Sequence, residues 1–200
     1  MNTAVIDIGT NTLLLLILDA AGQPVVDACR FGRLNQGLDA TGELAEAAIT
    51  RSLEICREYR ELLDAHEVVQ PTVIATQALR EATNAPAFVI PAEELLGATI
   101  EVIGGTREAA LAALATARTF PALAGVPHLV VDVGGGSTEL IVSAGAGVVS
   151  AVSLPIGAVR LTERHLRSDP PTVAELAALA ADIDRHLAPL VLPTGVTVVG

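Results

Sequence analysis

The feature that most constrains this chain is a strand–turn–strand pattern that occurs twice. Residues 130–142 hold an apolar run, an aspartate, a turn of three glycines and two hydroxyl residues, and a second apolar run. Residues 5–17 repeat the arrangement, and Asp7 aligns with Asp132 at an offset that also superposes the first glycine of each turn (132 − 7 = 125). The flanks are too short for helices and rich in Val, Ile and Leu, so they are predicted to be buried strands. Two such copies predict a duplicated fold whose two lobes present matching turns.

The composition of the second turn is typical of a phosphate site. Glycines let the backbone approach a ligand with no Cβ in the way, and their consecutive N–H groups can point at one anion. The hydroxyl side chains add donors, and Asp132 at the mouth of the turn is a hard oxygen ligand of the kind that Mg²⁺ accepts. An isolated copy could equally be an ordinary hairpin, but the duplication favours the phosphate interpretation. The turn residues concerned are Gly134, Gly135, Gly136, Ser137 and Thr138.

Composition limits the class of protein and its surroundings. Hydrophobic residues make up 51% of the 200, yet the longest apolar run, Leu13–Leu18, falls far short of the roughly 20 residues that a spanning helix needs. No lysine or arginine precedes Arg30, which argues against a secretory signal. With only two cysteines, Cys29 and Cys56, no disulfide framework is expected. We therefore expect a soluble, cytoplasmic protein that does not associate with membranes.

The charge pattern narrows the kinds of ligand. A formal net charge of −11 argues against a nucleic-acid partner, because phosphate backbones reward basic surfaces. A small polyanionic substrate stays compatible, since Mg²⁺, N–H groups and a few arginines can reverse the field locally. All 12 basic residues are arginine, so no P-loop lysine exists, and the strand pattern after Glu139 disfavours a Rossmann dinucleotide site. The four histidines are too scattered for a zinc site and are expected at the surface or as helix caps.

Strand patterns alternate with helix patterns, which predicts an α/β fold. We expect helices over 41–66, 106–118 and 172–188, and strands over 25–30, 73–75, 100–103, 148–154 and 194–200. The segment 119–127, with its prolines and glycine, is the predicted boundary, so the lobes are expected at 1–120 and 121–200. On the helix over 172–188, we assign Glu175, Asp182 and Asp184 to the outer face.

Glu108 has two interpretations. Thr106 is predicted to be the N-cap of the helix after strand 100–103, which puts Glu108 in the first turn. A carboxylate at that position can simply complement the helix dipole. A strand end followed by a helix N-terminus usually borders the cleft of such folds, so a catalytic role fits as well. The residue pattern alone leaves both open.

Five motifs occur in a specific order along nearly the whole chain: Asp7-x-Gly-Thr-Asn-Thr12, Thr76-x-Ala-x-Arg80-x-Ala-x-Asn84, Gly104-Gly105 before Glu108-Ala109, Asp132-x-Gly-Gly-Gly-Ser-Thr-Glu139 and Ser153-x-Pro-x-Gly157-x-Val-Arg160-Leu161. This series resembles the exopolyphosphatase and guanosine pentaphosphate phosphohydrolase family of the sugar kinase, actin and heat-shock chaperone superfamily. The resemblance implies a duplicated ribonuclease-H-like (actin-like ATPase) fold with two lobes around a cleft. It also implies that the second lobe is incomplete at the C-terminus, because the family's core is longer.

The activity that this resemblance implies is hydrolysis of the terminal phosphoanhydride of inorganic polyphosphate, or of guanosine pentaphosphate, the alarmone of the stringent response, with Mg²⁺. A homodimer is the assembly common among relatives. By match to the family motifs, Glu108 is the catalytic glutamate that activates water and Glu139 a further acid of the site. Asp7 and Asp132 would hold the metal. The phosphates would contact Thr10, Asn11, Thr12, Arg80 and the five residues of the second turn.

Two residues depart from the family pattern, and two other functions stay open. The family usually has an arginine where this chain has Ala110 and often an acid where it has Arg107, which bears on substrate preference or rate. One alternative function is an enzyme of the same superfamily that transfers phosphate from ATP to a small acceptor. The other is a non-catalytic module that binds polyphosphate or an alarmone.

Overall fold

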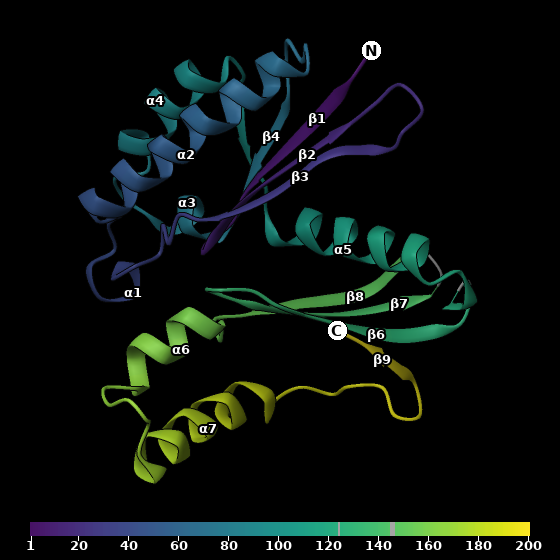
Figure 1. Cartoon of the computed structure of the whole chain (residues 1–200). Helices are drawn as coiled ribbons and strands as arrows, with labels where there is room; N and C mark the ends of the chain where they lie inside the picture. The colour runs from purple at the N-terminus through teal and green to yellow at the C-terminus, as the bar shows by residue number, and fades with distance from the viewer. Residues whose placement is uncertain (124, 145–146) are drawn as a thin grey trace. The chain divides into compact units, whose positions relative to one another are not determined.

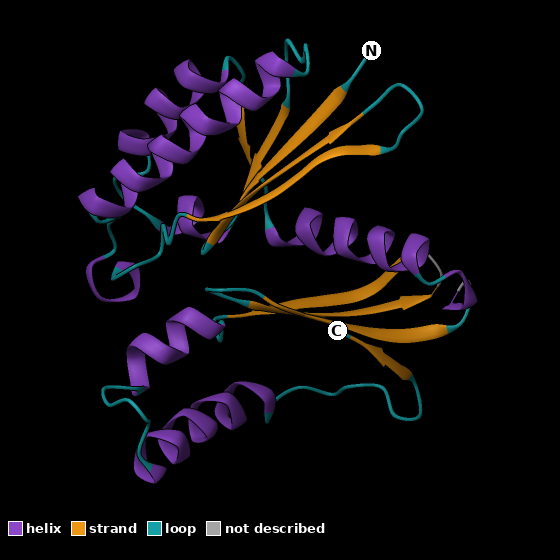
Figure 2. Cartoon of the chain, in the orientation of Figure 1, coloured by secondary structure: helices purple, strands orange, loops and turns teal. Residues whose placement is uncertain are grey.

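The structure is a computed structural model that describes residues 1–123, 125–144 and 147–200. Two compact units make up the chain, Met1–Ile103 and Gly104–Gly200, and each contains one β-sheet with helices packed on it (Figures 1 and 2). Within the described residues, no helix is both long enough and apolar enough to cross a membrane.

The sheet of the first unit has five strands in the order β3-β2-β1-β4-β5. β1, β2 and β3 are antiparallel neighbours, whereas β4 and β5 run parallel to β1. The strands are β1 (Thr3–Ile8), β2 (Thr12–Leu18), β3 (Pro24–Phe31), β4 (Thr72–Ala75) and β5 (Ile100–Val102). The helices are α1 (Leu38–Thr41), α2 (Glu46–Ala65), α3 (Gln77–Glu81) and α4 (Pro86–Leu96).

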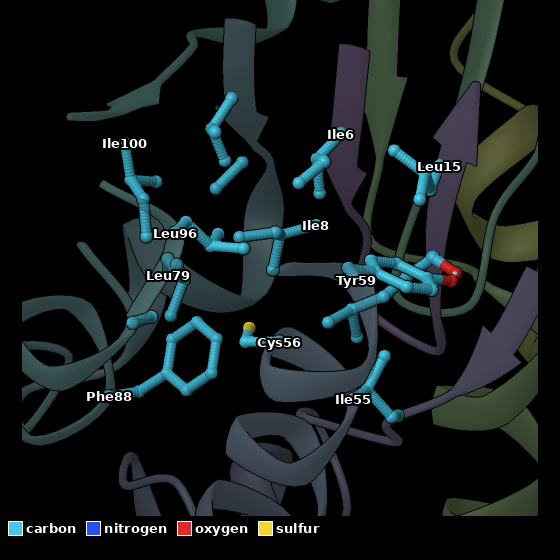
Figure 3. Packing of buried hydrophobic residues seen from close by; sticks show 14 of the residues in the cluster. Ile6, Ile8, Leu15, Ile55, Cys56, Tyr59, Leu79, Phe88, Leu96 and Ile100 are labelled. Carbon is cyan, nitrogen blue, oxygen red and sulfur yellow. Dashed lines mark hydrogen bonds between the residues drawn. The ribbon is translucent and has the colours of Figure 1, made fainter. Parts of the chain in front are cut away.

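The core of the first unit follows from the alternation of its strands. In β1, Ile6 and Ile8 are buried while the residue between them is only half-buried, as a two-residue period requires. The buried face packs against α2 and α4, from which Tyr59 and Phe88 enter the core (Figure 3). The Tyr59 hydroxyl donates to the Leu13 carbonyl at 2.6 Å, and burial raises the pKa of Tyr59 to about 12. This hydrogen bond ties α2 to β2.

The sheet of the second unit has four strands in the order β8-β7-β6-β9. Helix α5 covers one face, where Ala109 and Ala113 pack on Val130 and Ile141 (Figure 1). Helices α6 and α7 contribute to an apolar cluster with the other face. The strands are β6 (Pro127–Val133), β7 (Thr138–Ala144), β8 (Gly147–Leu154) and β9 (Thr197–Val199). The helices are α5 (Gly105–Thr119), a 3₁₀ turn η1 (Pro121–Leu123), α6 (Ala158–His165) and α7 (Val173–Leu187).

The two sheets confirm the predicted α/β duplication. In each, three consecutive antiparallel strands are followed by a fourth that pairs parallel to the first, β4 with β1 and β9 with β6. The offset found in the sequence holds for this fourth strand too, since β4 begins at Thr72 and β9 at Thr197 (197 − 72 = 125). The repeat therefore extends well beyond the two turns.

Two predicted helix starts are wrong. The helix expected over 41–66 is two helices, because Gly42 adopts a left-handed backbone (φ 72) that ends α1, and α2 begins at Glu46. Thr106 is not the N-cap of α5. Gly104, still extended after β5, takes that position, and the helix begins at Gly105. In contrast, Thr172 caps α7 in a full capping box with Glu175, as expected.

The contact pattern divides the chain at residue 103, whereas the lobes are predicted at 1–120 and 121–200. The difference is α5, which packs on β6, β7 and β8 and so groups with the second unit. Residue 124, inside the predicted boundary segment 119–127, lies outside the described residues. The lobe boundary between residues 120 and 121 therefore stays a prediction.

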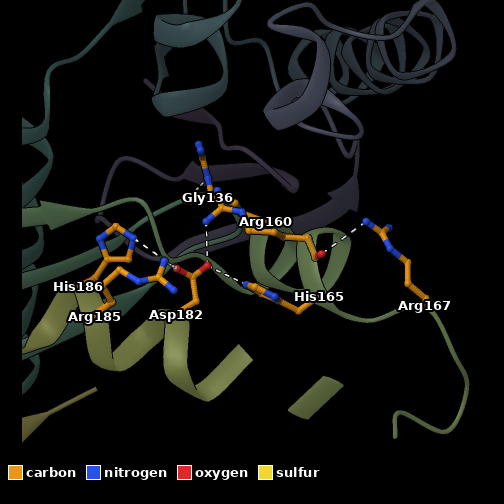
Figure 4. Close-up of polar contacts among 8 residues, drawn as sticks. Gly136, Arg160, His165, Arg167, Asp182, Arg185 and His186 are labelled. Atoms are coloured by element: carbon orange, nitrogen blue, oxygen red, sulfur yellow. Dashed lines mark hydrogen bonds and ion pairs between the residues drawn. The ribbon is translucent and has the colours of Figure 1, made fainter. Parts of the chain in front are cut away.

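Asp182 is not on an outer face, and the histidines are not all at the surface. Asp182 is only 2% exposed and accepts hydrogen bonds from Arg164 (2.9 Å), His165 (2.7 Å) and Arg185 (2.9 Å), which ties α6 to α7 (Figure 4). The hydrogen bond from His165 and then that from Arg164 lower the pKa of Asp182 to about 2. His128 is buried as well. Arg164 and His165 come from α6, so the periodicity of α7 alone does not predict that Asp182 is buried.

Candidate active site

The two glycine turns are closed in the same way. In the second unit, the Gly134 N–H donates to the Ser137 carbonyl at 2.9 Å. In the first, the Gly9 N–H donates to the Thr12 carbonyl at 2.9 Å, which is the same bond at the same offset (137 − 12 = 125). A Cβ on Gly9 would lie 2.9 Å from the Thr12 carbonyl oxygen, so that position requires glycine. The sequence repeat is thus a repeat of hydrogen bonding.

The carbonyls of the second turn are held from behind by the start of α6. The Ala158 N–H donates to Gly134 O and the Val159 N–H to Gly135 O, each at 2.9 Å. The Arg160 Nε donates to Gly136 O at 2.9 Å (Figure 4). The first N–H groups of a helix have no acceptor within the helix, so a turn that supplies carbonyls there satisfies both partners.

This arrangement directs the N–H groups of the turn. In a planar trans peptide the N–H points opposite to the carbonyl, so the N–H groups of Gly135, Gly136 and Ser137 point away from α6. Across the described part of the chain, none of these three has a protein acceptor. A hydrogen bond accepted by a peptide's carbonyl also polarises its N–H. Successive N–H groups presented together are a backbone arrangement that can bind an anion.

Gly157 lets α6 come this close to the turn. A Cβ built on Gly157 would lie 2.4 Å from the carbonyl carbon and oxygen of Gly135 and from the carbonyl carbon of Gly136. These are backbone atoms, so they cannot rotate away as a side chain could. Any larger residue at position 157 would therefore separate the helix from the turn.

The first turn is supported in the same manner by the segment that follows β3. The Asn35 N–H donates to Thr10 O at 3.2 Å, which corresponds to the bond from Arg160 N–H to Gly135 O at 3.1 Å (160 − 35 = 125). The Arg33 N–H donates to Asn11 O at 2.9 Å. The N–H groups of Asn11 and Thr12 are thereby directed away from this segment. Each unit thus carries a turn whose carbonyls accept hydrogen bonds from one side while its N–H groups are directed to the other.

The other predicted residues of the first unit share the edge at which this turn lies. Asp7 is half-buried near the end of β1, and Arg80 lies in α3 directly after β4. The Arg80 Nη1 donates to the carbonyl of Ile103, which follows β5, at 2.6 Å. Carboxyl ends of parallel strands meet at one edge of a sheet, where ligands bind in α/β folds. Asp7, the turn and Arg80 therefore belong to one local site.

The predicted acids of the second unit share one face of its sheet. Asp132 on β6 and Glu139 on β7 are directly paired, so their side chains project to the same side. The α5-facing residues Val130 and Ile141 are two positions away in the same strands, which identifies that side as the α5 side. Glu108 lies half-buried in the first turn of α5.

Glu139 lines a small cavity next to the start of α5. The cavity has a volume of about 250 Å³ and is also lined by Gly105, Thr106 and Ser153. Glu139 is 3% exposed, and its Oε1 accepts a hydrogen bond from the Ser153 hydroxyl at 2.6 Å. The Ser153 hydroxyl thus holds the Glu139 carboxylate at the wall of this cavity.

The donor chemistry of this face fits Mg²⁺. The described residues hold no group of three or more His, Cys, Asp or Glu side chains that could bind a metal ion by themselves. Mg²⁺, however, is usually held by one or two carboxylates together with water and substrate phosphate oxygens, and Asp132 beside Glu139 offers that set. Thr138 helps to fix the end of the turn, since its hydroxyl donates to Ile156 O at 2.6 Å.

Three residues that build the site were not assigned roles from the sequence. Ser153, Gly157 and Arg160 belong to a motif that resembles the family, but only the structure shows that they hold Glu139 and the second turn. A glycine two residues after a proline, where a strand gives way to a helix, was the available signal. Such a glycine indicates that another segment packs closely against it, but it does not identify that segment.

Comparison with known proteins agrees with this geometry. The sequence model of the Ppx/GppA phosphatase family matches residues 19–198, so the chain belongs to that family. Exopolyphosphatase 2 of Mycobacterium tuberculosis (strain ATCC 25618 / H37Rv) is 40% identical over 198 residues, which cover 93% of this chain and 61% of the relative. The chain has the duplicated ribonuclease-H-like, actin-like fold of the family.

Two crystal structures show the same architecture. An exopolyphosphatase-like protein is 40% identical with a TM-score of 0.85 and is matched over 94% of this chain and 60% of its own. An exopolyphosphatase from Cytophaga hutchinsonii ATCC 33406 is 30% identical with a TM-score of 0.87 and is matched over 94% and 61%. The chain thus spans about three fifths of the length of these relatives.

Proposed function

We propose that the protein carrying this chain hydrolyses the terminal phosphoanhydride of inorganic polyphosphate and releases phosphate. The observation that carries the proposal is the second turn, whose three N–H groups are directed outward by α6 and can bind a terminal phosphoryl group. Membership in the Ppx/GppA family and likeness to proteins named exopolyphosphatases support it.

In this proposal the two turns bind phosphate oxygens, and Arg80 neutralises charge on the polyanion. Glu108 orients a water molecule and accepts its proton as the water oxygen attacks the terminal phosphorus. The bond from that phosphorus to the bridging oxygen breaks, and the shortened chain leaves with the bridging oxygen. Mg²⁺ held by Asp132, with Glu139 beside it, would supply charge neutralisation, and Asp7 is the metal ligand that we propose in the first unit. In such a phosphoryl transfer, positioning of the reactants and electrostatic stabilisation account for most of the catalysis.

Guanosine pentaphosphate presents the same terminal anhydride, and we propose it as a second substrate. With that substrate the protein would act in the stringent response. We also propose that it is cytoplasmic and forms a homodimer. Cys29 and Cys56 are both free thiols, in keeping with a reducing compartment. The net charge of −11 argues against a nucleic-acid partner.

The test is phosphate release from long-chain polyphosphate and from guanosine pentaphosphate, with Mg²⁺ and with a chelator. We expect Mg²⁺-dependent release by the wild type and at least a 100-fold loss of kcat in Glu108→Gln, which removes the base but keeps the size. Glu54→Gln, at an exposed site on α2, is the matched control and should behave as the wild type. Wild type that binds polyphosphate yet releases no more phosphate than Glu108→Gln would make the chain a binding module. Transfer to a small acceptor from ATP alone would make it a kinase.

A further inference from the structure

Arg33 has an unusual backbone conformation, and its side chain forms no hydrogen bond or ion pair within the described residues. Its φ is 52°, in the left-handed region that glycine and asparagine tolerate and other residues seldom adopt. The backbone is fixed there by the bond from its N–H to Asn11 O and by the bond from the Gln36 N–H to its own carbonyl at 3.0 Å. A residue held in this region at a binding turn points to a function for its side chain.

The side chain of Arg33 is exposed and has no partner in the described residues. It forms neither an ion pair nor a side-chain hydrogen bond. Two nearby arginines of the first unit are engaged: Arg30 pairs with Glu58, and Arg51 donates to Gly32 O at 2.8 Å. In a chain of net charge −11, a guanidinium left beside a phosphate turn is positioned to meet an anion.

The polar group next to it is also incompletely satisfied. Asn35, whose N–H supports Thr10 O, is 5% exposed, and its Oδ1 finds no hydrogen-bond partner in the described structure. Buried amide oxygens are normally bonded, to protein or to a bound molecule. Asn35 Oδ1 is an acceptor and needs a donor such as water, so within the segment 33–35 the group that can bond a phosphate oxygen is the Arg33 guanidinium.

We propose that Arg33 is a substrate-binding residue that contacts the polyphosphate chain beyond the phosphoryl group held in the turn. The inference rests on the proposed function and deepens it by adding a determinant of chain-length preference. Its backbone bonds directly to the first turn and its side chain is exposed, so the guanidinium is free to reach phosphates that project from the turn. Arginine suits this role because its planar fork bonds two phosphate oxygens at once.

The test compares Arg33→Gly and Arg33→Lys with the wild type, using direct binding of tripolyphosphate and of long-chain polyphosphate together with KM and kcat. Arg33→Gly removes the donor and relieves the left-handed backbone. For Arg33→Gly we expect the affinity for the long chain to fall roughly tenfold and that for tripolyphosphate to fall about twofold or less. We expect kcat to be unchanged and the melting temperature to be higher. Arg33→Lys should fall between, since it keeps the charge and loses the fork. Arg57→Ala, an exposed arginine on α2, is the charge-matched control and should bind both as the wild type does.

Each contrary outcome is distinct. Long-chain binding by Arg33→Gly at wild-type strength would overturn this inference while leaving the proposed function intact. Weaker binding with a lower melting temperature would also overturn it, because the loss would then report damage to the fold. A wild type that neither binds nor cleaves polyphosphate would overturn both.

Discussion

Ser153 fixes Glu139 through one short hydrogen bond between paired strands, and its removal should affect chemistry more than folding. Ser153→Ala leaves the buried Glu139 Oε1 without its donor. We expect kcat/KM for polyphosphate to fall about tenfold, the size of one hydrogen bond to a charged group. Ser153→Thr should restore most of it, and Ser150→Ala, exposed on the same strand, should have no effect. Equal activity of Ser153→Ala and the wild type would refute a role for this bond.

Gly157 permits the contact between α6 and the second turn. In Gly157→Ala the added methyl group overlaps backbone atoms of Gly135 and Gly136, so the turn must move. We expect at least a 100-fold loss of kcat/KM, since a displacement near 1 Å is enough for that, and a loss of about 2 kcal/mol in stability. The control is Gly147→Ala, whose methyl group meets only Ala144 O at 3.5 Å. A fully active Gly157→Ala, measured by phosphate release, would contradict the proposed role of the turn.

At this scale the sequence predicts residue types better than partners. The glycines and the aspartates of both turns follow from the repeated pattern, because backbone approach and oxygen ligation dictate those residue types. The bond from Ser153 to Glu139 does not follow, because it depends on the register of β7 and β8. The prediction for Asp182 was wrong for a related reason: Arg164 and His165, which cover it, come from α6, and the sequence of α7 alone does not identify them.

Helix α6 links the phosphate turn at its start to the Asp182 cluster at its end. Its first N–H groups hold the turn, and Arg164 and His165 in its last turn hold Asp182 of α7 (Figure 4). An eight-residue helix is too short to be stable by itself, so both attachments matter for its position. This coupling was not predicted from the sequence.

Asp182→Asn tests the anchor of α6. Removing one partner from a buried ion cluster leaves its neighbours uncompensated, here moderated by the exposure of Arg185. We expect a loss on the order of 2 kcal/mol in the free energy of unfolding, measured by urea denaturation. Asp184→Asn on the exposed side of α7 is the control. Equal stability of the two variants would show that the cluster does not anchor the helix.

The Asp182 carboxylate also makes the free energy of unfolding depend on pH, and its lowered pKa gives the direction of that dependence. The pKa of Asp182 is lowered from 3.8 to about 2 in the folded state, so the unfolded chain binds its proton more readily. The stabilisation is therefore complete above pH about 4 and is lost as the pH falls toward 2. Unfolding curves between these values should show this loss in the wild type. A loss of the same size in Asp182→Asn would assign it to other groups.

For the whole chain, the duplication is the property that the sequence determined most securely. The offset of 125 residues relates strands, turns and the hydrogen bonds behind the turns, because both halves solve the same packing problem. The helix boundaries were less predictable, since Gly42 and Gly104 end or start helices according to backbone angles that the pattern does not reveal. Each unit carries one glycine turn closed and supported by corresponding hydrogen bonds, and the proposed function assigns phosphate binding to both turns.

The central claim is that the outward N–H groups of the second turn bind phosphate, and amide NMR tests it most directly. Tripolyphosphate and Mg²⁺ are titrated into ¹⁵N-labelled protein while the backbone amide resonances are followed. We predict that the amides of Gly135, Gly136 and Ser137 show large, saturable shifts at the concentration that half-saturates phosphate release. Unchanged resonances for these three amides during active hydrolysis would contradict the account.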